Sequence, residues 1–363
     1  MKLLLPFSWL YAAIVGLRNK LFDGGVLRQE GVGVPVISVG NLTVGGTGKT
    51  PLVEYIAAYL LQKRIRVAVV SRGYKRKSKG TVAVSDGKSL LVSAEQSGDE
   101  PYQMAEKLRE AIVVVGEKRV DAARLAVKEF GANVVLMDDG FQHRYLKRDL
   151  DIVVIDATKD ITQDYVLPAG RLREPVAGLQ RASLIAFSKF DETVVGQFDM
   201  DRKLERRFSG PTIRYRYRIK EVRRVHDDGL ASVDVVRRMR LMAFSGIGTH
   251  GAFLHDLRKH GFAPLSDMRF SDHHPFSEGD VATLASFAKA MEADACITTE
   301  KDAVRLRAHR ELLQSLVDEI PVFYLTIEVE VLEGKDQLHS LIDQCLGGFL
   351  NEHWNHGHSK QKD

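Results

Sequence analysis

The stretch that most constrains this chain of 363 residues is VISVGNLTVGGTGKTP, residues 36–51. An apolar run, typical of a buried strand, leads into a glycine-rich turn that ends in Gly48-Lys49-Thr50 and opens a segment with helical apolar spacing. Such a turn forms a cradle of backbone N–H groups at a helix N-terminus, which binds phosphate. The Lys49 ammonium adds positive charge beside the β- and γ-phosphates, and the Thr50 hydroxyl is a ligand for Mg²⁺. The sequence therefore predicts a nucleotide-binding phosphate loop.

One position departs from the usual pattern of such loops, because Thr43 stands where the first glycine is expected. Gly45 and Gly46 follow it, so we expect a loop whose beginning has a different shape. A glycine turn without a ligand is the alternative, and the specificity of Gly-Lys-Thr after a strand argues against it. The residues predicted to bind the nucleotide are Thr43, Val44, Gly45, Gly46, Thr47, Gly48, Lys49 and Thr50.

Short apolar strands alternate with helical segments from residue 31 to residue 211. This alternation predicts an α/β fold, a P-loop NTPase-like parallel sheet with helices on both faces. Ligands of such sheets bind beyond the C-terminal ends of the strands, where the phosphate loop falls. We expect residues 31–211 to form a P-loop kinase domain.

The pattern changes after residue 211, because residues 212–225 and 322–332 alternate apolar and charged side chains. That alternation is typical of half-exposed strands. We expect the two to pair as a ribbon that joins the kinase domain to a smaller second α/β lobe, residues 226–321, which includes one helix from Ala303 to Ser315. A helix over residues 333–350 should return to the first lobe, and residues 351–363 should form a flexible tail.

The N-terminus is an uncharged run from Leu3 to Leu17, followed by Arg18, Lys20 and Arg28. Fifteen helical residues reach only about 22 Å, short of the roughly 30 Å hydrocarbon core of a bilayer. A signal peptide and a helix that packs against the core are alternatives. We favour a helix within residues 1–30 that is held in the cytoplasmic leaflet of a membrane, with basic residues beside the lipid headgroups.

Carboxylates follow another apolar strand, because residues 134–137 end in Asp138 and Asp139. Phosphoryl transfer needs a carboxylate at such a strand end to hold Mg²⁺ directly or through water. Glu174 follows two arginines in the proline-bounded segment 167–175, and we expect it to support the metal from a neighbouring position. The predicted metal-side residues are thus Thr50, Asp138, Asp139 and Glu174. A turn capped by the aspartate pair is the alternative.

Two further polar groups are candidates for acid–base chemistry. Asp99 and Glu100 precede Pro101, which is also a common way to begin a helix. A kinase acting on an alcohol needs a carboxylate that accepts the hydroxyl proton. In the second lobe, Asp272-His273-His274 could support such a base, bind a metal or serve the fold alone, and the residues themselves leave these three readings open.

Composition excludes few functions. The formal net charge of +4 is too small to indicate nucleic-acid binding, and nothing in the sequence requires an obligate protein partner. Cys296 and Cys345 lie in apolar surroundings without the spacing of a metal site, which favours buried free thiols in a reducing compartment.

Taken in order, the motifs resemble those of the tetraacyldisaccharide 4′-kinases, the lipid A kinases of Gram-negative bacteria. The ordered set spans nearly the whole chain, and the segments that carry the resemblance are residues 39–51, 71–74, 98–101, 138–143, 167–175, 244–248, 270–273 and 299–302. The family usually has Asn-Pro after Gly248, where this chain has Thr249-His250, so we expect a different local turn there.

The resemblance implies transfer of the ATP γ-phosphate to the 4′-hydroxyl of a tetraacylated glucosamine disaccharide 1-phosphate. It also implies Mg²⁺ and a membrane-associated N-terminal helix. Carried over by motif, Asp99 is the catalytic carboxylate and His273 supports it from the second lobe. The strongest rival is a membrane-associated switch ATPase of the partitioning type. Such ATPases carry a lysine just before the glycine pair, and Val44 occupies that position here.

Overall fold

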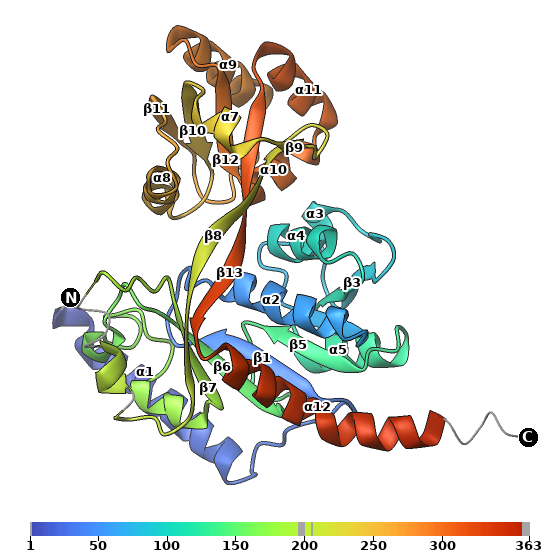
Figure 1. Ribbon diagram of the computed structural model, residues 1–363. Helices are drawn as coiled ribbons and strands as arrows, with labels where there is room; N and C mark the ends of the chain where they lie inside the picture. The colour runs from blue at the N-terminus through green and yellow to red at the C-terminus, as the bar shows by residue number, and fades with distance from the viewer. Residues whose placement is uncertain (1, 195–199, 205, 358–363) are drawn as a thin grey trace, which may run out of the picture.

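The fold was analysed in a computed structural model, which describes residues 2–194, 200–204 and 206–357. Within these residues the strands form one thirteen-stranded sheet in the order β11-β10-β12-β13-β8-β7-β6-β1-β5-β2-β4-β3, with β9 paired to β8. The sheet continues from a lower, larger lobe into an upper, smaller one (Figure 1). The predicted α/β fold class is confirmed.

The first lobe is built on a buried parallel sheet. Strand β1 (Val36–Asn41) lies between β5 (Val134–Asp138) and β6 (Leu150–Asp156), and every residue of the three is buried. The sheet is extended by β2 (Val67–Ser71), β4 (Ile112–Val115), β7 (Leu184–Ser188) and the antiparallel edge strand β3 (Val82–Asp86). Because β1, β2 and β5 run parallel, their C-terminal ends meet at one edge of the sheet.

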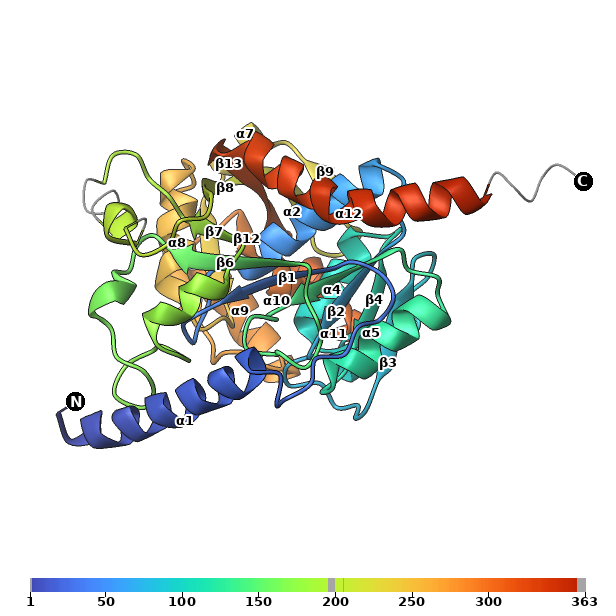
Figure 2. The ribbon, with the colours of Figure 1, turned by 90° about the horizontal axis from the view of Figure 1, so that it is seen from below.

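Helices cover both faces of this sheet. On one face α2 (Lys49–Gln62), α4 (Asp99–Lys107) and α12 (Lys335–Gly357) pack on alternate strand residues, and α5 (Arg119–Lys128) packs on the opposite face (Figure 2). Shorter helical segments are α3 (Ala94–Ser97), η2 (Ile161–Gln163) and η3 (Val176–Arg181). Residues 351–357, expected in a flexible tail, belong to α12, and residues 358–363 lie outside the described part of the chain.

A long antiparallel pair connects the lobes. Strands β8 (Thr212–Arg224) and β13 (Val322–Glu333) pair over most of their length, and arginines on β8 face glutamates on β13. At one end β8 pairs with β7, and at the other β13 pairs with β12, so the two strands belong to the sheet of each lobe. These two strands thus join the two lobes into one continuous sheet.

The second lobe contains β9 (Leu230–Ala231), β10 (Leu241–Ser245), β11 (Ser266–Arg269) and β12 (Ala295–Thr299). Its helices are α7 (Val233–Arg237), α8 (His250–Lys259), α9 (Glu278–Ala290), α10 (Glu300–Arg307) and α11 (Arg310–Glu319). The expectation of one helix from Ala303 to Ser315 was wrong, because His309 leaves the helical region (φ −121°, ψ 78°) and separates α10 from α11.

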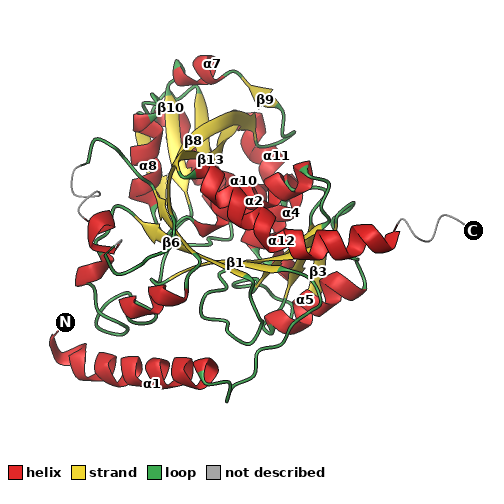
Figure 3. Cartoon of the chain, turned by 60° about the horizontal axis from the view of Figure 1, so that its bottom comes forward, coloured by secondary structure: helices red, strands yellow, loops and turns green. Residues whose placement is uncertain are grey.

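Helix α1 (Leu5–Asp23), which follows the short turn η1 (Lys2–Leu4), lies along the outer edge of the first lobe (Figure 3). Its outward residues are large and apolar, with Phe7, Trp9, Leu10 and Leu17 each more than 60% exposed. Ser8 and Phe22, by contrast, are buried against the lobe. Among the described helices, none is both long enough and apolar enough to cross a membrane.

Candidate active site

The phosphate loop connects β1 to α2 as the sequence predicts. Gly48 caps α2 in the left-handed region (φ 82°), a conformation that glycine adopts without strain. The loop's carbonyls accept hydrogen bonds from neighbouring strands: Ser188 Oγ donates to Thr47 O (2.7 Å), and the Tyr215 and Tyr217 hydroxyls donate to Gly48 O (3.1 and 3.2 Å). These donors orient the carbonyls toward the protein, so the start of α2 faces the strand-end edge with its N–H groups.

Thr43 now has a physical explanation. It forms an antiparallel bridge with Leu172, and its neighbour Val44 donates from its backbone N to Arg171 O at 2.8 Å. On the other side, Arg173 N donates to Leu42 O at 2.6 Å. The loop thus begins as extended chain paired with segment 167–175, and extended backbone does not require glycine.

Lys49 and Asp139 form an ion pair at the mouth of this loop. Lys49 Nζ lies 3.3 Å from Asp139 Oδ1, and Arg173 Nη1 donates to both oxygens of Asp139 at 2.8 and 2.9 Å. Burial opposes ionisation of Asp139, but the two cations outweigh it and lower the pKa of this carboxyl. Asp139 is therefore ionised and already paired.

The neighbouring Asp138 is in the opposite situation. It is 3% exposed, and its Oδ2 accepts only a long hydrogen bond from Ser71 Oγ (3.3 Å). Burial, followed by repulsion from Glu100 and Asp139, raises the pKa of Asp138 to about 7. Among the described residues, Asp138 Oδ1 has no hydrogen-bond partner. A buried carboxylate oxygen without a donor fits a site that a hydrated cation completes.

Asp99 and His273, which are 174 positions apart in the chain, are in contact. His273 Nδ1 lies 2.9 Å from Asp99 Oδ2, and each side chain is 18% exposed. Arg305, in the last turn of α10, donates from Nε to the same oxygen at 2.8 Å. Burial raises the pKa of Asp99, but His273 and Arg305 outweigh it and the pKa falls, so the carboxylate stays ionised.

The loop that carries His273 is held by the second lobe. His273 has a positive φ of 60°, and its backbone N donates to Gly246 O at 3.0 Å. Arg305 Nη1 donates to the same carbonyl at 2.9 Å, so one arginine orients both Asp99 and the His273 loop. Such a left-handed residue persists where surrounding contacts determine it.

Glu174, predicted to support the metal from a neighbouring position, is buried and held by side chains from three elements. It is 1% exposed, and its oxygens accept hydrogen bonds from Gln142 Nε2 (2.8 Å), Asn19 Nδ2 (3.1 Å) and Arg181 Nη2 (2.8 Å). Gln142 also contacts Arg173, the partner of Asp139, at 3.5 Å. Glu174 is thus linked to Asp139 through two side chains.

Sequence reasoning missed several residues that shape the site. Arg305 follows Lys301 by one helical turn, directly after a strand, which is a readable signal for two cations on one helix face. Tyr215 and Tyr217 are two residues apart on a strand and so share a face. The role of Gln142 depends on a tertiary contact, and no local pattern indicates it.

Comparison with known proteins decides the family. A profile of the tetraacyldisaccharide-1-P 4′-kinase family matches residues 1–347. The chain belongs to this family. A curated tetraacyldisaccharide 4′-kinase from Chlorobaculum parvum is 40% identical over 347 residues, 95% of this chain and 94% of the relative. Another from Syntrophotalea carbinolica is 39% identical over 92% of this chain and 90% of its own length. Both the suspected family and the prediction of a kinase are confirmed.

A solved structure agrees. LpxK from Aquifex aeolicus, crystallised in complex with ATP, superimposes with a TM-score of 0.75 at 35% identity, over 95% of this chain and 98% of the other. ATP as the nucleotide is thereby confirmed, and the partitioning-type ATPase is no longer a competing interpretation.

Proposed function

We propose that this kinase transfers the γ-phosphate of ATP to the 4′-hydroxyl of a tetraacylated glucosamine disaccharide 1-phosphate, in lipid A biosynthesis. The observation that carries the proposal is the Asp99–His273 contact, which joins the two lobes. Glu100, the neighbour of Asp99, lies close enough to Asp138 to raise the pKa of that carboxyl. We name Lys49, Thr50, Asp138 and Asp139 the donor side, and Asp99, His273 and Arg305 the acceptor side.

On the acceptor side, Asp99 takes the proton of the attacking hydroxyl. As the bond from the sugar oxygen to the γ-phosphorus forms, the bond from that phosphorus to the β–γ bridging oxygen breaks, and ADP leaves with the electron pair. The hydroxyl proton moves to the Asp99 carboxylate, which its cationic neighbours keep ionised and ready to accept it. His273 orients Asp99, and its ring can pass the proton on.

On the donor side, Lys49 binds the phosphates as a point charge and the loop holds them with backbone N–H groups. Asp138, with its unpartnered Oδ1, and the Thr50 hydroxyl would hold Mg²⁺. When bound, Mg²⁺ neutralises charge on the transferred phosphate. Among the described residues no group of three or more His, Cys, Asp or Glu side chains is arranged as a metal cage. Mg²⁺ bound through one or two protein ligands and phosphates needs no such cage.

The proposed location is the cytoplasmic face of the inner membrane, with the exposed apolar face of α1 in the lipid. Lys20 and Arg28 are exposed and available to anionic headgroups. Arg18, which the sequence also suggested for this purpose, instead donates to Gln142 O at 3.0 Å and packs over the Phe22 ring.

The test is to incubate the purified protein with γ-labelled ATP and the tetraacylated disaccharide 1-phosphate dispersed in detergent, and then to locate the label. We expect label on the lipid. Label that appears solely as free phosphate, with a well-dispersed acceptor, would refute the proposed acceptor.

A further inference from the structure

The inward face of α1 makes a set of polar contacts that an anchor alone does not need. The Tyr11 hydroxyl donates to Arg173 O at 3.0 Å, and Asn19 Nδ2 donates to Glu174 Oε2 at 3.1 Å. The buried hydroxyl of Ser8 accepts from Ala169 N at 2.9 Å. All three contacts reach segment 167–175, and they join residues 155 to 162 positions apart in the chain.

Segment 167–175 leads to the donor side by two routes. Through side chains, Glu174 holds Gln142, Gln142 contacts Arg173, and Arg173 binds both oxygens of Asp139, the partner of Lys49. Through the backbone, residues 171–173 pair with residues 42–44 at the start of the phosphate loop. A displacement of this segment therefore moves the partner of Lys49 and the phosphate loop together.

The central group of this connection is unusually well fixed. Glu174 is 1% exposed, and its donors come from three separate elements: α1, the turn after β5, and η3. Removing one of the three donors of a buried carboxylate is costly in free energy, because its negative charge is then less well compensated. Segment 167–175 is thus sensitive to the position of Asn19.

We infer that α1, besides contacting lipid, positions the donor side, with Asn19 and Tyr11 as positioning residues for Arg173 and the phosphate loop. Packing of α1 on the first lobe would then be needed to keep the Lys49–Asp139 ion pair in place. This inference uses the proposed lipid kinase reaction for its activity assay, but its structural content is independent of the acceptor.

The variant Asn19→Ala tests the inference, with Lys20→Ala as the matched control. Lys20 neighbours Asn19 on α1 but is exposed, so its replacement leaves the segment untouched. In detergent micelles, we expect Asn19→Ala to lower kcat about tenfold, since outer hydrogen-bond partners of such sites typically contribute 10- to 100-fold. Any change of kcat in Lys20→Ala should scale with its weaker binding to lipid. Co-sedimentation with vesicles containing one-third anionic lipid should be unchanged for Asn19→Ala and weaker for Lys20→Ala.

A second readout needs no acceptor. Hydrogen exchange measured by mass spectrometry should show faster exchange in residues 42–50 and 167–175 of Asn19→Ala, and no change in these segments of Lys20→Ala. If the wild type fails to label the lipid while this exchange pattern holds, the proposed acceptor is wrong and the positioning role stands.

Three results for Asn19→Ala would each overturn the inference. The first is a kcat within twofold of wild type, and the second is a loss of kcat that follows lost vesicle binding. The third is unchanged hydrogen exchange in residues 42–50 and 167–175. Tyr11→Phe removes only one hydroxyl and guards against a folding defect. We expect it to lower kcat about threefold with an unchanged thermal midpoint, and wild-type kcat in that variant would also count against the inference.

Discussion

The donor side and the acceptor side of the site hold their carboxylates by different means. Asp138 ends β5 and Asp139 follows it, and the cations that meet Asp139 come from the same lobe. Asp99 also begins in the first lobe, but both of its partners, His273 and Arg305, come from the second. The donor side is therefore complete within one lobe, whereas the acceptor side exists only while the lobes touch. Binding of nucleotide and chemistry at the acceptor should thus be separable by mutation.

Replacing Asp99 by Asn should separate nucleotide binding from acceptor chemistry most strongly. The amide keeps the shape of the side chain but cannot accept the hydroxyl proton, and general bases typically contribute 10²- to 10⁴-fold. We expect kcat to fall about a thousandfold, while the dissociation constant of ATP, measured by calorimetry, changes less than twofold. His273→Gln should lower kcat less, and the double variant should be little worse than Asp99→Asn, because the two residues act as one unit.

Lys49→Met should instead weaken the binding of ATP. The change removes the ammonium that pairs with Asp139 and faces the phosphates, while retaining most of the side-chain volume. A charged hydrogen bond contributes about 1.5–3 kcal/mol, so we expect ATP to bind roughly 10- to 100-fold more weakly. Calorimetric titration measures this directly. Wild-type affinity for ATP in this variant would mean that the loop binds the nucleotide without its lysine.

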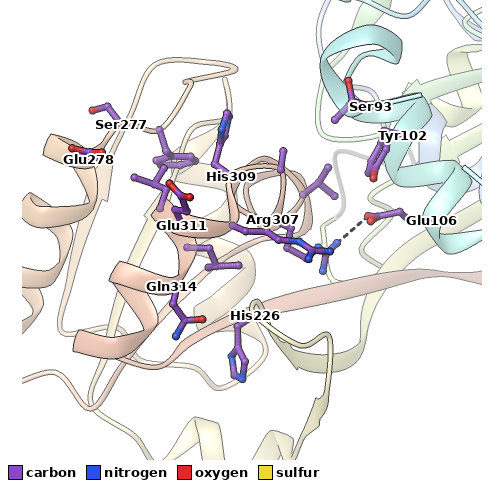
Figure 4. Close-up of a pocket in the computed structure, with 17 residues that line it drawn as sticks. Ser93, Tyr102, Glu106, His226, Ser277, Glu278, Arg307, His309, Glu311 and Gln314 are labelled. Atoms are coloured by element: carbon purple, nitrogen blue, oxygen red, sulfur yellow. Dashed lines mark hydrogen bonds and ion pairs between the residues drawn. The ribbon is translucent and has the colours of Figure 1, made fainter. Parts of the chain in front are cut away.

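The contact between the lobes offers a milder and more specific perturbation. Helix α4 meets α10 through four ion pairs, one of which joins Glu106 to Arg307 at 3.0 Å across a cavity of about 1210 Å³ (Figure 4). Arg307 also binds Asp228 and the Tyr324 hydroxyl, so it stays fixed in the second lobe when Glu106 is replaced.

We expect Glu106→Gln to lower kcat two- to fivefold at unchanged ATP affinity, because a partly buried ion pair contributes on the order of 1 kcal/mol. The deficit should grow with salt, which screens the three remaining pairs. Glu311 lies in the wall of the same cavity and, among the described residues, forms no ion pair with the first lobe, so Glu311→Gln is a control that should behave as wild type. A change in ATP affinity in Glu106→Gln would contradict the separation of the two sides.

The donor side was easier to predict from sequence than the acceptor side, for a physical reason. Gly48-Lys49-Thr50 and the Asp138-Asp139 pair each follow a buried strand, and parallel strands deliver their ends to one edge. The Asp99–His273 contact bridges 174 positions and rests on how two lobes meet, which no local pattern encodes. Only the resemblance to a family brought those residues together in advance. Gln142 escaped notice because tertiary contacts alone give it partners, and the contact of Arg305 with Asp99 likewise depends on how the lobes meet.

The smallest expected effect concerns Asp138 and pH. Burial and two neighbouring carboxylates raise the pKa of Asp138 to about 7 without metal, whereas the unfolded value is near 4. Between these values the folded state binds more protons than the unfolded state, so this group makes the metal-free protein less stable as pH rises from about 4 to 7.

The variant Asp138→Asn should remove that slope. We expect its thermal midpoint without metal to exceed that of the wild type by a few degrees at pH 7.5, and the two to converge near pH 5, where Asp138 is protonated in the folded protein. Mg²⁺ with ATP should raise the wild-type midpoint more than that of the variant, because only the wild type has a carboxylate to ionise against the cation. If the thermal midpoints of the wild type and Asp138→Asn stay parallel across pH 5–7.5, Asp138 is ionised in the metal-free protein. Its Oδ1 would then have a hydrogen-bond donor in solution.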